Sequence, residues 1–417
     1  FPYTTLFRSC TFLTGFICWF LFRKQHRELK TRDGFLIVVL FWFGFCLFAS
    51  LPFIFVISHH THNFTDAFFE SVSGFTTTGA TIINHVEKLP HAILFYRQQL
   101  QFLGGMGIVV LAVAILPMLG VGGMQLYRAE TPGPMKDSKL TPRIAHTAKA
   151  LWSIYFLLTL LCMLTYWLAG MNWFDALGES FATVSTGGFS MHNNSFAYYK
   201  SDLIEFIACL FMLLGGTNFA LHFIAFQKRT LRHYWHDEEF RTYFLFLSLS
   251  SALVTTCLVL YKYTHWNTHT LIQSAFNVIS MATTTGFVSE PFHNWPTFSP
   301  IFIILLAIIG GCAASTSGGI KVIRALLIYK QSKREIPRLL HPNAIIPIKF
   351  GKHALPEQVL QSMWAFISVF IALFLLLMLV FMALGNDFLT TFSAITATLT
   401  NSGTGLGKVS SNFTHLS

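Results

Sequence analysis

Long runs of apolar residues alternate with shorter polar stretches along most of the chain. Seven runs approach or exceed the ~20 residues that a helix needs to cross a bilayer core of ~30 Å. They lie at 35–57, 103–119, 151–169, 203–226, 243–261, 298–328 and 363–384. An eighth run, at 11–22, has only 12 residues and is too short to span. The pattern predicts an all-α polytopic membrane protein with seven spans and one stub.

Outer segments that are too long for hairpin turns and too apolar for solvated loops separate successive pairs of spans. Each contains a short helical pattern, and these patterns begin near Asp66, Asp175, Thr270 and Asp387. Asp or Thr at a helix start can cap its first N–H groups. Because apolar segments this short favour a re-entrant path over a spanning one, we expect four pore half-helices.

Each half-helix runs into a stretch of small and hydroxyl residues centred on a glycine. The stretches read TTTGAT, STGGFS, TTTGFV and NSGTGLG. Their central glycines are spaced by 108, 99 and 117 residues, and they are Gly79, Gly187, Gly286 and Gly403. This internal repeat of about 100 residues predicts four pseudo-symmetric units of helix, pore half-helix, filter loop and helix around a central pore.

Non-helical backbone at membrane depth is tolerated only where it lines a polar cavity, because an unsatisfied peptide group in lipid costs several kcal/mol. Four such loops on one axis could form carbonyl rings that replace the water shell of an alkali cation. Glycine permits the required backbone dihedrals, and the C-terminal ends of the half-helices favour a cation. One loop alone would favour packing through small residues, whereas four loops in phase favour an ion filter.

A cluster of small residues interrupts the apolar run at 298–328. We expect this helix to break in mid-membrane, directly below the filter, and to form a gate. The residues of this predicted gate are Gly310, Gly311, Ala313, Ala314, Ser315, Thr316, Ser317, Gly318 and Gly319. Close helix packing is the alternative, and it is the favoured interpretation for Gly104, Gly105 and Gly107. Arg97, at the head of the second span, either snorkels to the interface or influences how ions enter.

The composition and the charge pattern narrow the class of protein. Of the 417 residues, 53% are hydrophobic and 11% are charged, against ~25% charged residues in soluble domains. Of the 28 lysines and arginines, 22 fall in four segments, at 23–32, 128–149, 228–241 and 321–352. The positive-inside rule places these segments in the cytoplasm. We find no continuous basic face for nucleic acid, no catalytic set and no fingerprint of an organic cofactor, so nothing supports an enzyme.

On the basis of these motifs, the chain resembles the Trk/Ktr/HKT superfamily of cation transporters from about residue 11 onward. Besides the four loops, the resemblance rests on GGCAASTSGGIKVIR at 310–324, FLGGMGIVVLAVAILP at 102–117, MQLYRAETPGP at 124–134 and RELKTRDGFLIVV at 27–39. It implies potassium uptake across the bacterial inner membrane by a homodimer in which each protomer has its own pore. It also implies a cytosolic TrkA-type nucleotide-binding regulator that acts on the gate.

The resemblance also implies which residues form the potassium filter and the gate. The filter residues would be Thr77, Thr78, Gly79, Ser185, Thr186, Gly187, Thr284, Thr285, Gly286, Asn401, Ser402 and Gly403. The gate would be the loop from about Gly310 to Gly319. Two features depart from the family pattern. Thr404 replaces a proline in the fourth loop, and the sequence stops at Ser417 before the expected final span, so we expect a fragment truncated at both ends.

Three alternative functions remain open on the sequence. A sodium-conducting relative would carry serine in place of the first filter glycine, so Gly79 favours potassium. Flux could be passive or coupled to protons or sodium. An unrelated secondary solute transporter would have two repeats, with helix N-termini facing the substrate, whereas this chain has four repeats with C-termini facing inward.

These inferences predict the following organisation. Repeats 1 to 4 occupy 34–127, 150–228, 242–330 (with the gate loop) and 358–417 (without its final helix). A remnant of an N-terminal helical pair and a basic linker occupy 1–33, and cytoplasmic linkers occupy 128–149, 229–241 and 331–357.

Overall fold

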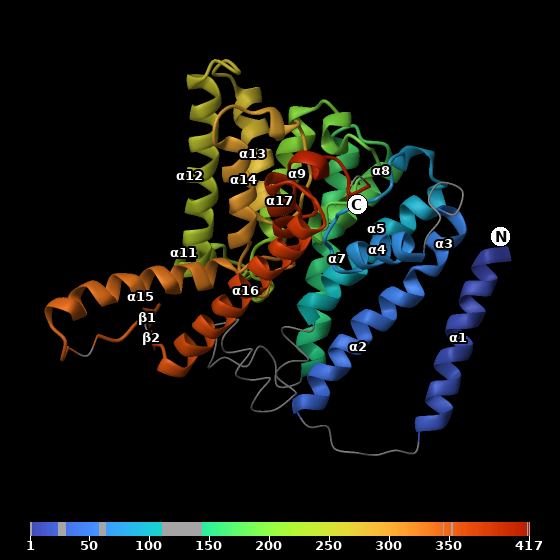
Figure 1. The fold of residues 1–417 in the computed structure, drawn as a ribbon, viewed down its shortest axis with the longest axis horizontal. Coiled ribbons are helices and arrows are strands. Elements are labelled where there is room, and N and C mark those ends of the chain that lie inside the picture. Colours follow the sequence, from blue (N-terminus) through green and yellow to red (C-terminus); the bar gives the residue numbers. More distant parts are fainter. Residues whose placement is uncertain are drawn as a thin grey trace.

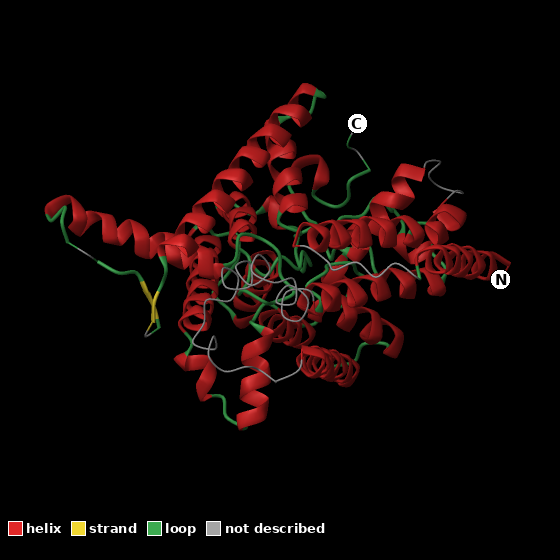
Figure 2. Ribbon diagram, turned by 90° about the horizontal axis from the view of Figure 1, so that it is seen from below, coloured by secondary structure: helices red, strands yellow, loops and turns green. Residues whose placement is uncertain are grey.

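The computed structural model describes residues 2–23, 31–57, 64–110, 144–344, 346–351, 353–414 and 416. Figure 1 shows a bundle of helices, with α15 (Val322–Leu340) and a small hairpin of β1 (Lys349–Phe350) and β2 (His353–Ala354) projecting from one side. Seen from below, loop segments run through the middle of the molecule between the helices (Figure 2).

The described helices can be divided into four groups, each of which contains one short helix followed by a glycine loop. The first group contains α1 (Pro2–Phe22), α2 (Thr31–Ala49), α3 (Leu51–Ile57), α4 (Phe64–Phe75) and α5 (His91–Val110). The second contains α7 (Ile144–Leu168), α8 (Trp173–Val184), α9 (Asp202–Gly215) and α10 (Phe219–Lys228). The third contains α11 (Arg232–His236), α12 (Glu238–Leu260), α13 (Thr268–Ala282), α14 (Ser299–Ile309) and α15, and the fourth contains α16 (Glu357–Ala383) and α17 (Phe388–Leu399).

The short helices α4, α8, α13 and α17 connect the four groups to one another. Each packs against the long helix that precedes it within its own group. In addition, α5 packs against α8, α9 against α13, and α14 against α17. The outgoing helix of one group therefore supports the short helix of the next, and this arrangement brings the four short helices together.

The four predicted half-helices are present, but three of them start earlier than predicted. Asn172 caps α8 and Asn267 caps α13, where the sequence pattern pointed to Asp175 and Thr270. Only Asp387 caps its helix as expected, since its carboxylate accepts a hydrogen bond from Thr390 N at 3.0 Å. Asparagine is as good a cap as aspartate. The side chain of Asn172 accepts a hydrogen bond from Phe174 N, and that of Asn267 accepts one from Thr270 N.

Not every predicted span is a single straight helix. Within the described residues, three helices are long and apolar enough to cross a membrane, and the bent pair α9–α10 gives a fourth candidate. The apolar run at 35–57 is divided into α2 and α3 at Ser50, two residues before Pro52. The helix that contains the apolar run at 11–22 is longer than that run. This helix, α1, starts at Pro2 and has 21 residues.

The prediction of one continuous span at 203–226 is wrong. The chain bends by 96° between α9 and α10. Gly216 ends α9, and the Asn218 side chain accepts a hydrogen bond from Ala220 N at 2.9 Å and so starts α10. The physical reason is that the backbone groups released at this break bond to another segment, the loop between α14 and α15.

Much of the apolar surface faces outward. Only 6% of the most apolar window of α16 is buried within the protein. Large apolar side chains such as Leu376, Leu379 and Val369 are exposed along this helix. A surface of this size is stable in contact with lipid rather than water.

Candidate functional site

The same backbone turn occurs at the C-terminal end of all four short helices. In each turn an amide N–H donates to the carbonyl five residues earlier, at 2.7–2.8 Å, and the preceding amide donates to the carbonyl three residues earlier. The bonds that span five residues are donated by the N–H groups of Thr78, Gly187, Thr285 and Ser402. Their acceptors are the carbonyls of Ser73, Ala182, Ser280 and Ala397, respectively. This pair of bonds is the Schellman motif, so the four loops leave their helices along one common path.

The first residue of each turn has an unfavourable backbone conformation. The φ angles are 57° at Thr77, 51° at Thr186, 57° at Thr284 and 58° at Asn401. For β-branched threonine this left-handed region is a genuine outlier and costs about 1–3 kcal/mol. Three threonines remain there only because the surrounding contacts determine the path of the chain.

The turns correct the register of the second loop. The second positive-φ position in each loop is a glycine, with φ of 80°, 81°, 83° and 70° at Gly79, Gly188, Gly286 and Gly403. Gly188, and not Gly187, is therefore the equivalent of Gly79. The predicted triplet Ser185, Thr186, Gly187 lies one residue too early, and the equivalent triplet is Thr186, Gly187, Gly188. The sequence left this ambiguous because the second loop contains two adjacent glycines.

The four loops contact one another in a closed ring. A Cβ atom added to any of the four glycines would lie 2.0–2.3 Å from a carbonyl oxygen of the neighbouring loop. These pairs run from Gly79 to Gly187 O, Gly188 to Thr285 O, Gly286 to Ser402 O, and Gly403 to Thr78 O. The order is loop 1 to 2, 2 to 3, 3 to 4 and 4 back to 1. A side chain at any of these positions would push two loops apart.

Two rows of backbone carbonyls in this ring have no protein donor. In the part of the chain that the structure describes, no hydrogen bond is donated to the carbonyls of the eight residues with positive φ. They belong to Thr77, Thr186, Thr284, Asn401, Gly79, Gly188, Gly286 and Gly403. Unpaired carbonyls at membrane depth need a polar partner, and rings of carbonyls are suited to a dehydrated cation. The assignment of particular ligand atoms stays a prediction.

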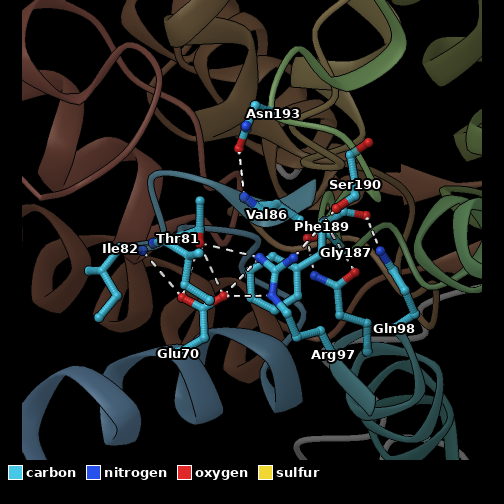
Figure 3. A network of polar contacts seen from close by, with 12 residues as sticks. Glu70, Thr81, Ile82, Val86, Arg97, Gln98, Gly187, Phe189, Ser190 and Asn193 are labelled. Atoms are coloured by element: carbon cyan, nitrogen blue, oxygen red, sulfur yellow. Dashed lines mark hydrogen bonds and ion pairs between the residues drawn. The ribbon is translucent and has the colours of Figure 1, made fainter. Parts of the chain in front are cut away.

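A network of buried polar side chains supports loops 1 and 2 from behind (Figure 3). Arg97 on α5 is only 1% exposed, and its Nε donates to Glu70 Oε1 at 2.8 Å. The guanidinium also donates to Thr81 Oγ1 at 3.2 Å and to Ser190 O at 3.4 Å, and it lies 4.1 Å from the centre of the Phe189 ring. Arg97 therefore does not snorkel to the membrane surface. It bridges the segments that leave the first and second loops.

Two glutamates occupy equivalent places in this network. Glu70 and Glu179 each lie nine residues before the equivalent glycine. Glu70 accepts from Thr81 Oγ1 and from Ile82 N at 3.2 Å, and Glu179 accepts from Ser190 Oγ and from Met191 N at 2.8 Å. Each buried carboxylate thus holds the chain that leaves its own filter loop. The shared spacing independently supports the corrected register.

Two glutamines on α5 complete the support of the second loop. Gln98 Nε2 donates to Phe189 O at 2.9 Å, and Gln101 Nε2 donates to Gly187 O at 2.6 Å. The Gln101 side-chain oxygen accepts from Phe189 N at 3.2 Å. Neither Gln98 nor Gln101 was among the residues predicted from the sequence. The signal that could have revealed Gln101 is its position four residues after Arg97, on the same face of the helix.

The predicted break between α14 and α15 is present, and the intervening residues 310–321 form a loop that contacts the predicted filter loops. Gly318 N donates to Thr284 Oγ1 at 2.6 Å, and Gly319 N donates to Thr400 O at 3.1 Å. Thr316 Oγ1 and Thr186 Oγ1 are 3.1 Å apart. The intramembrane loop thus bonds to the second, third and fourth filter loops.

The bend between α9 and α10 and the intramembrane loop satisfy each other's backbone groups. Cys312 N donates to Gly216 O at 2.8 Å, and Phe219 N donates to Ala314 O at 3.1 Å. The pair Gly215-Gly216 followed by a capping asparagine was a sequence signal for this break.

His192 lies in the outer segment after the second filter loop. Its ring nitrogens lie 3.1 Å from the Asp175 carboxylate and 3.6 Å from the Glu87 carboxylate. Burial opposes the charged form, but the hydrogen bond and charge of Asp175, with the charges of Glu179 and Glu87, raise the pKa of His192. His192 therefore lies between carboxylates of the first and second groups.

Known proteins with this sequence pattern share the fold. Residues 4–417 match the TrkH family, described as a cation transport protein. The chain belongs to the TrkH family. It is 52% identical over 405 residues to the Trk system potassium uptake protein TrkH of Escherichia coli K12, covering 96% of this chain and 83% of that protein. The chain is 42% identical to the Trk system potassium uptake protein TrkG of the same organism. This match covers 96% of this chain and 82% of TrkG.

The crystal structure of the potassium transporter TrkH from Vibrio parahaemolyticus matches the structure with a TM-score of 0.90. The two share 45% identity over 99% of this chain and 85% of the other. These findings confirm the predicted resemblance and the predicted class, a polytopic helical membrane protein. The β1–β2 hairpin is a small addition to the all-α prediction.

We predict that the Glu70–Arg97 ion pair stabilises this TrkH family member as a unit. Replacing Arg97 alone by Met leaves a buried carboxylate without a counter-charge, which should lower the free energy of unfolding by about 3–5 kcal/mol. Adding Glu70→Gln should recover part of this loss, because no uncompensated charge remains. Thermal unfolding of the purified variants in detergent measures both effects.

The exposed Lys88 in the outer segment offers a matched control. Lys88→Met also removes one positive charge, but it should leave the unfolding temperature within a few degrees of the wild type because surface charges contribute little. If the double variant were as unstable as Arg97→Met alone, the pair would not act as a unit.

Proposed function

We propose that this chain is a potassium uptake protein of the bacterial inner membrane and conducts the ion through the four-loop filter. The observation that carries the proposal is the closed ring of loops, with two rows of carbonyls to which no hydrogen bond is donated from the described residues. The printed names of the relatives, which describe potassium uptake by the Trk system, support the choice of ion. Potassium is the transported substrate in this proposal, and transport needs no organic cofactor.

The ion selectivity follows from the first loop. Relatives that conduct sodium are expected to carry serine where this chain has Gly79. The Cβ of a serine at this position would lie 2.2 Å from Gly187 O. Gly79 therefore supports potassium over the sodium alternative. Coupling to protons or sodium is compatible with the same filter.

We further propose that residues 310–321 form the gate. Four residues of this loop have positive φ, namely Gly310, Ala314, Gly319 and Lys321. A loop held in strained conformations between two discrete contact surfaces is suited to move as a unit. The assembly we propose is a homodimer with one pore in each protomer, regulated from the cytosol by a TrkA-type nucleotide-binding partner.

Growth of an uptake-deficient bacterium at low potassium tests the function. We expect the full-length gene, expressed with its TrkA-type partner, to restore growth at limiting potassium and to support rubidium uptake. Normal membrane expression without restored growth would count against potassium transport. Restored growth that depended on added sodium would favour the coupled alternative.

The Gly79→Ser substitution tests the filter. We expect the preference for potassium over sodium to fall about tenfold, which corresponds to ~1.4 kcal/mol, because the added Cβ pushes the first and second loops apart and so displaces carbonyls of the ring. Parallel rubidium and sodium uptake, normalised to membrane protein, measures the ratio. An unchanged preference in a folded variant would contradict the assignment of Gly79 to the filter.

The control for this experiment needs a glycine away from the ring. Gly105 does not qualify, although the sequence pattern favoured a packing role, because an added Cβ would lie 2.8 Å from Ser185 Cβ beside the second loop. Gly107 is suitable, since its added Cβ would meet only the Trp42 ring at an ordinary 3.7 Å. Gly107→Ser should keep the ion preference of the wild type.

Shortening the intramembrane loop tests the gate. Deletion of residues 313–317 removes contacts to the α9–α10 break and to the second filter loop. In the full-length protein we expect potassium flux in the absence of the regulator to rise severalfold. Equal or lower flux in correctly assembled protein would favour a packing role for the loop.

A further inference from the structure

Three consecutive carboxylates mark the start of α12, beside the intramembrane loop. Asp237 caps the helix, because its Oδ1 accepts from Phe240 N at 2.8 Å. The next two residues, Glu238 and Glu239, point to different partners outside their own helix. These partners belong to the segments that form and follow the loop at 310–321.

Glu239 holds the beginning of the intramembrane loop. Its Oε1 accepts a hydrogen bond from Ala313 N at 2.6 Å, and the residue is only 5% exposed. One buried side chain from α12 therefore contacts the loop near its beginning. Without it, the buried Ala313 N–H would lose its acceptor, which is costly in an interior without water.

Glu238 holds the arm that follows the loop. Its carboxylate pairs with the Lys330 ammonium on α15 and accepts from Gly351 N, at the β1–β2 turn, at 3.0 Å. In Figure 1 this arm of α15 and the hairpin projects from the bundle. A displacement of the arm would therefore pull on the same helical turn that carries Glu239.

The other anchors of the loop are less suited to a test by substitution. Cys312 and Ala314 bond to the α9–α10 break through backbone groups, which a substitution does not remove. Thr316, Gly318 and Gly319 bond to Val184, Thr284 and Thr400, which lie in or directly before the filter loops. A change at any of them would alter both structures at once. Glu239 differs because it approaches the loop from α12 and contacts no filter residue among the hydrogen bonds of the described chain.

We propose that Glu239 is a positioning residue of the gate, which holds the intramembrane loop beneath the filter through Ala313 N, and that Glu238 links this anchor to the α15–hairpin arm. The inference rests on the proposed function of the loop as a gate. It adds a specific side chain that sets the gate position and a route by which a force on the cytoplasmic arm reaches it.

Substitutions at Glu239 in the full-length protein test this inference. Glu239→Ala removes the acceptor, so we expect potassium flux without the regulator to rise about tenfold, or ~1.4 kcal/mol in the equilibrium between loop positions. Glu239→Gln should stay close to the wild type, because its amide oxygen still accepts from Ala313 N. Glu239→Asp keeps the charge but shortens the side chain, so it should give an intermediate rise. The ratio of rubidium to sodium uptake should not change in any of these variants.

Glu335→Ala is a matched control for the loss of a carboxylate. Glu335 is exposed on α15, and its carboxylate pairs only with Arg334 and Arg338 on the same helix among the described residues. This variant should have wild-type flux with and without the regulator. Lys330→Ala, in contrast, should reduce the response to the regulator, because it removes one of the two contacts between the arm and Glu238.

Hydrogen exchange separates the failure of this inference from the failure of the proposed function. In purified protein, Glu239→Ala and Glu239→Asp should speed amide exchange across 310–321 relative to Glu239→Gln and to Glu335→Ala, whether or not the protein conducts potassium. Unchanged exchange in the folded variants would overturn the positioning role. Faster exchange with unchanged flux would overturn the link between the anchor and gating. A wild type without potassium flux but with the expected exchange pattern would overturn only the proposed function.

Discussion

The structure depends on one steric constraint, the close approach of a glycine in each filter loop to a carbonyl oxygen of the next. At all four contacts a Cβ atom would approach within 2.3 Å of that oxygen. Each glycine therefore fixes the position of a neighbouring loop as well as its own. Because the contacts close into a ring, no loop can shift alone, and the strained threonines before the glycines are held in place by the same closure. The Schellman turns at the helix ends then set the direction in which each chain enters the ring.

The four loops are supported by two different kinds of chemistry. Loops 1 and 2 are supported by the buried Glu70–Arg97 ion pair and by the hydrogen bonds of the buried Glu179 carboxyl group. Loops 3 and 4 contact the intramembrane loop through neutral groups, Thr284 Oγ1 and Thr400 O. A buried ion pair is costly to break, whereas single neutral hydrogen bonds contribute only about 0.5–1.5 kcal/mol each. Among the described residues, loop 1 is held by the ion pair and has no hydrogen bond to the intramembrane loop, whereas loops 2 to 4 bond to it through neutral groups. In the gating that we propose, these neutral bonds are the ones that a moving loop would exchange.

The sequence predicted the half-helices, the glycine loops and the break after α14, because each leaves a local signature of small, hydroxyl or capping residues in an apolar chain. It predicted less well where several local solutions fit equally. Adjacent Gly187 and Gly188 could both have been the central glycine, and only the hydrogen bonds and φ angles of the folded loop decide between them. Arg97 was interpreted from its position at a helix end, since its partners Glu70 and Ser190 lie far away in the sequence. Long-range pairing of this kind has no local pattern.

The two helix breaks explain how irregular backbone is tolerated so far from water. The bend after α9 exposes the carbonyls of Gly215 and Gly216, and the intramembrane loop exposes the amides of Cys312 and Thr316, which donate to them. In return, Ala314 O accepts from Phe219 N at the start of α10. Either break alone would leave several peptide groups unpaired in a low-dielectric interior, at a cost of several kcal/mol each. The breaks are therefore stable only as a pair. In the gating that we propose, the moving loop would exchange these bonds for others, with water or with the ion path, so we expect the energetic barrier at the contact between α9–α10 and residues 312–316.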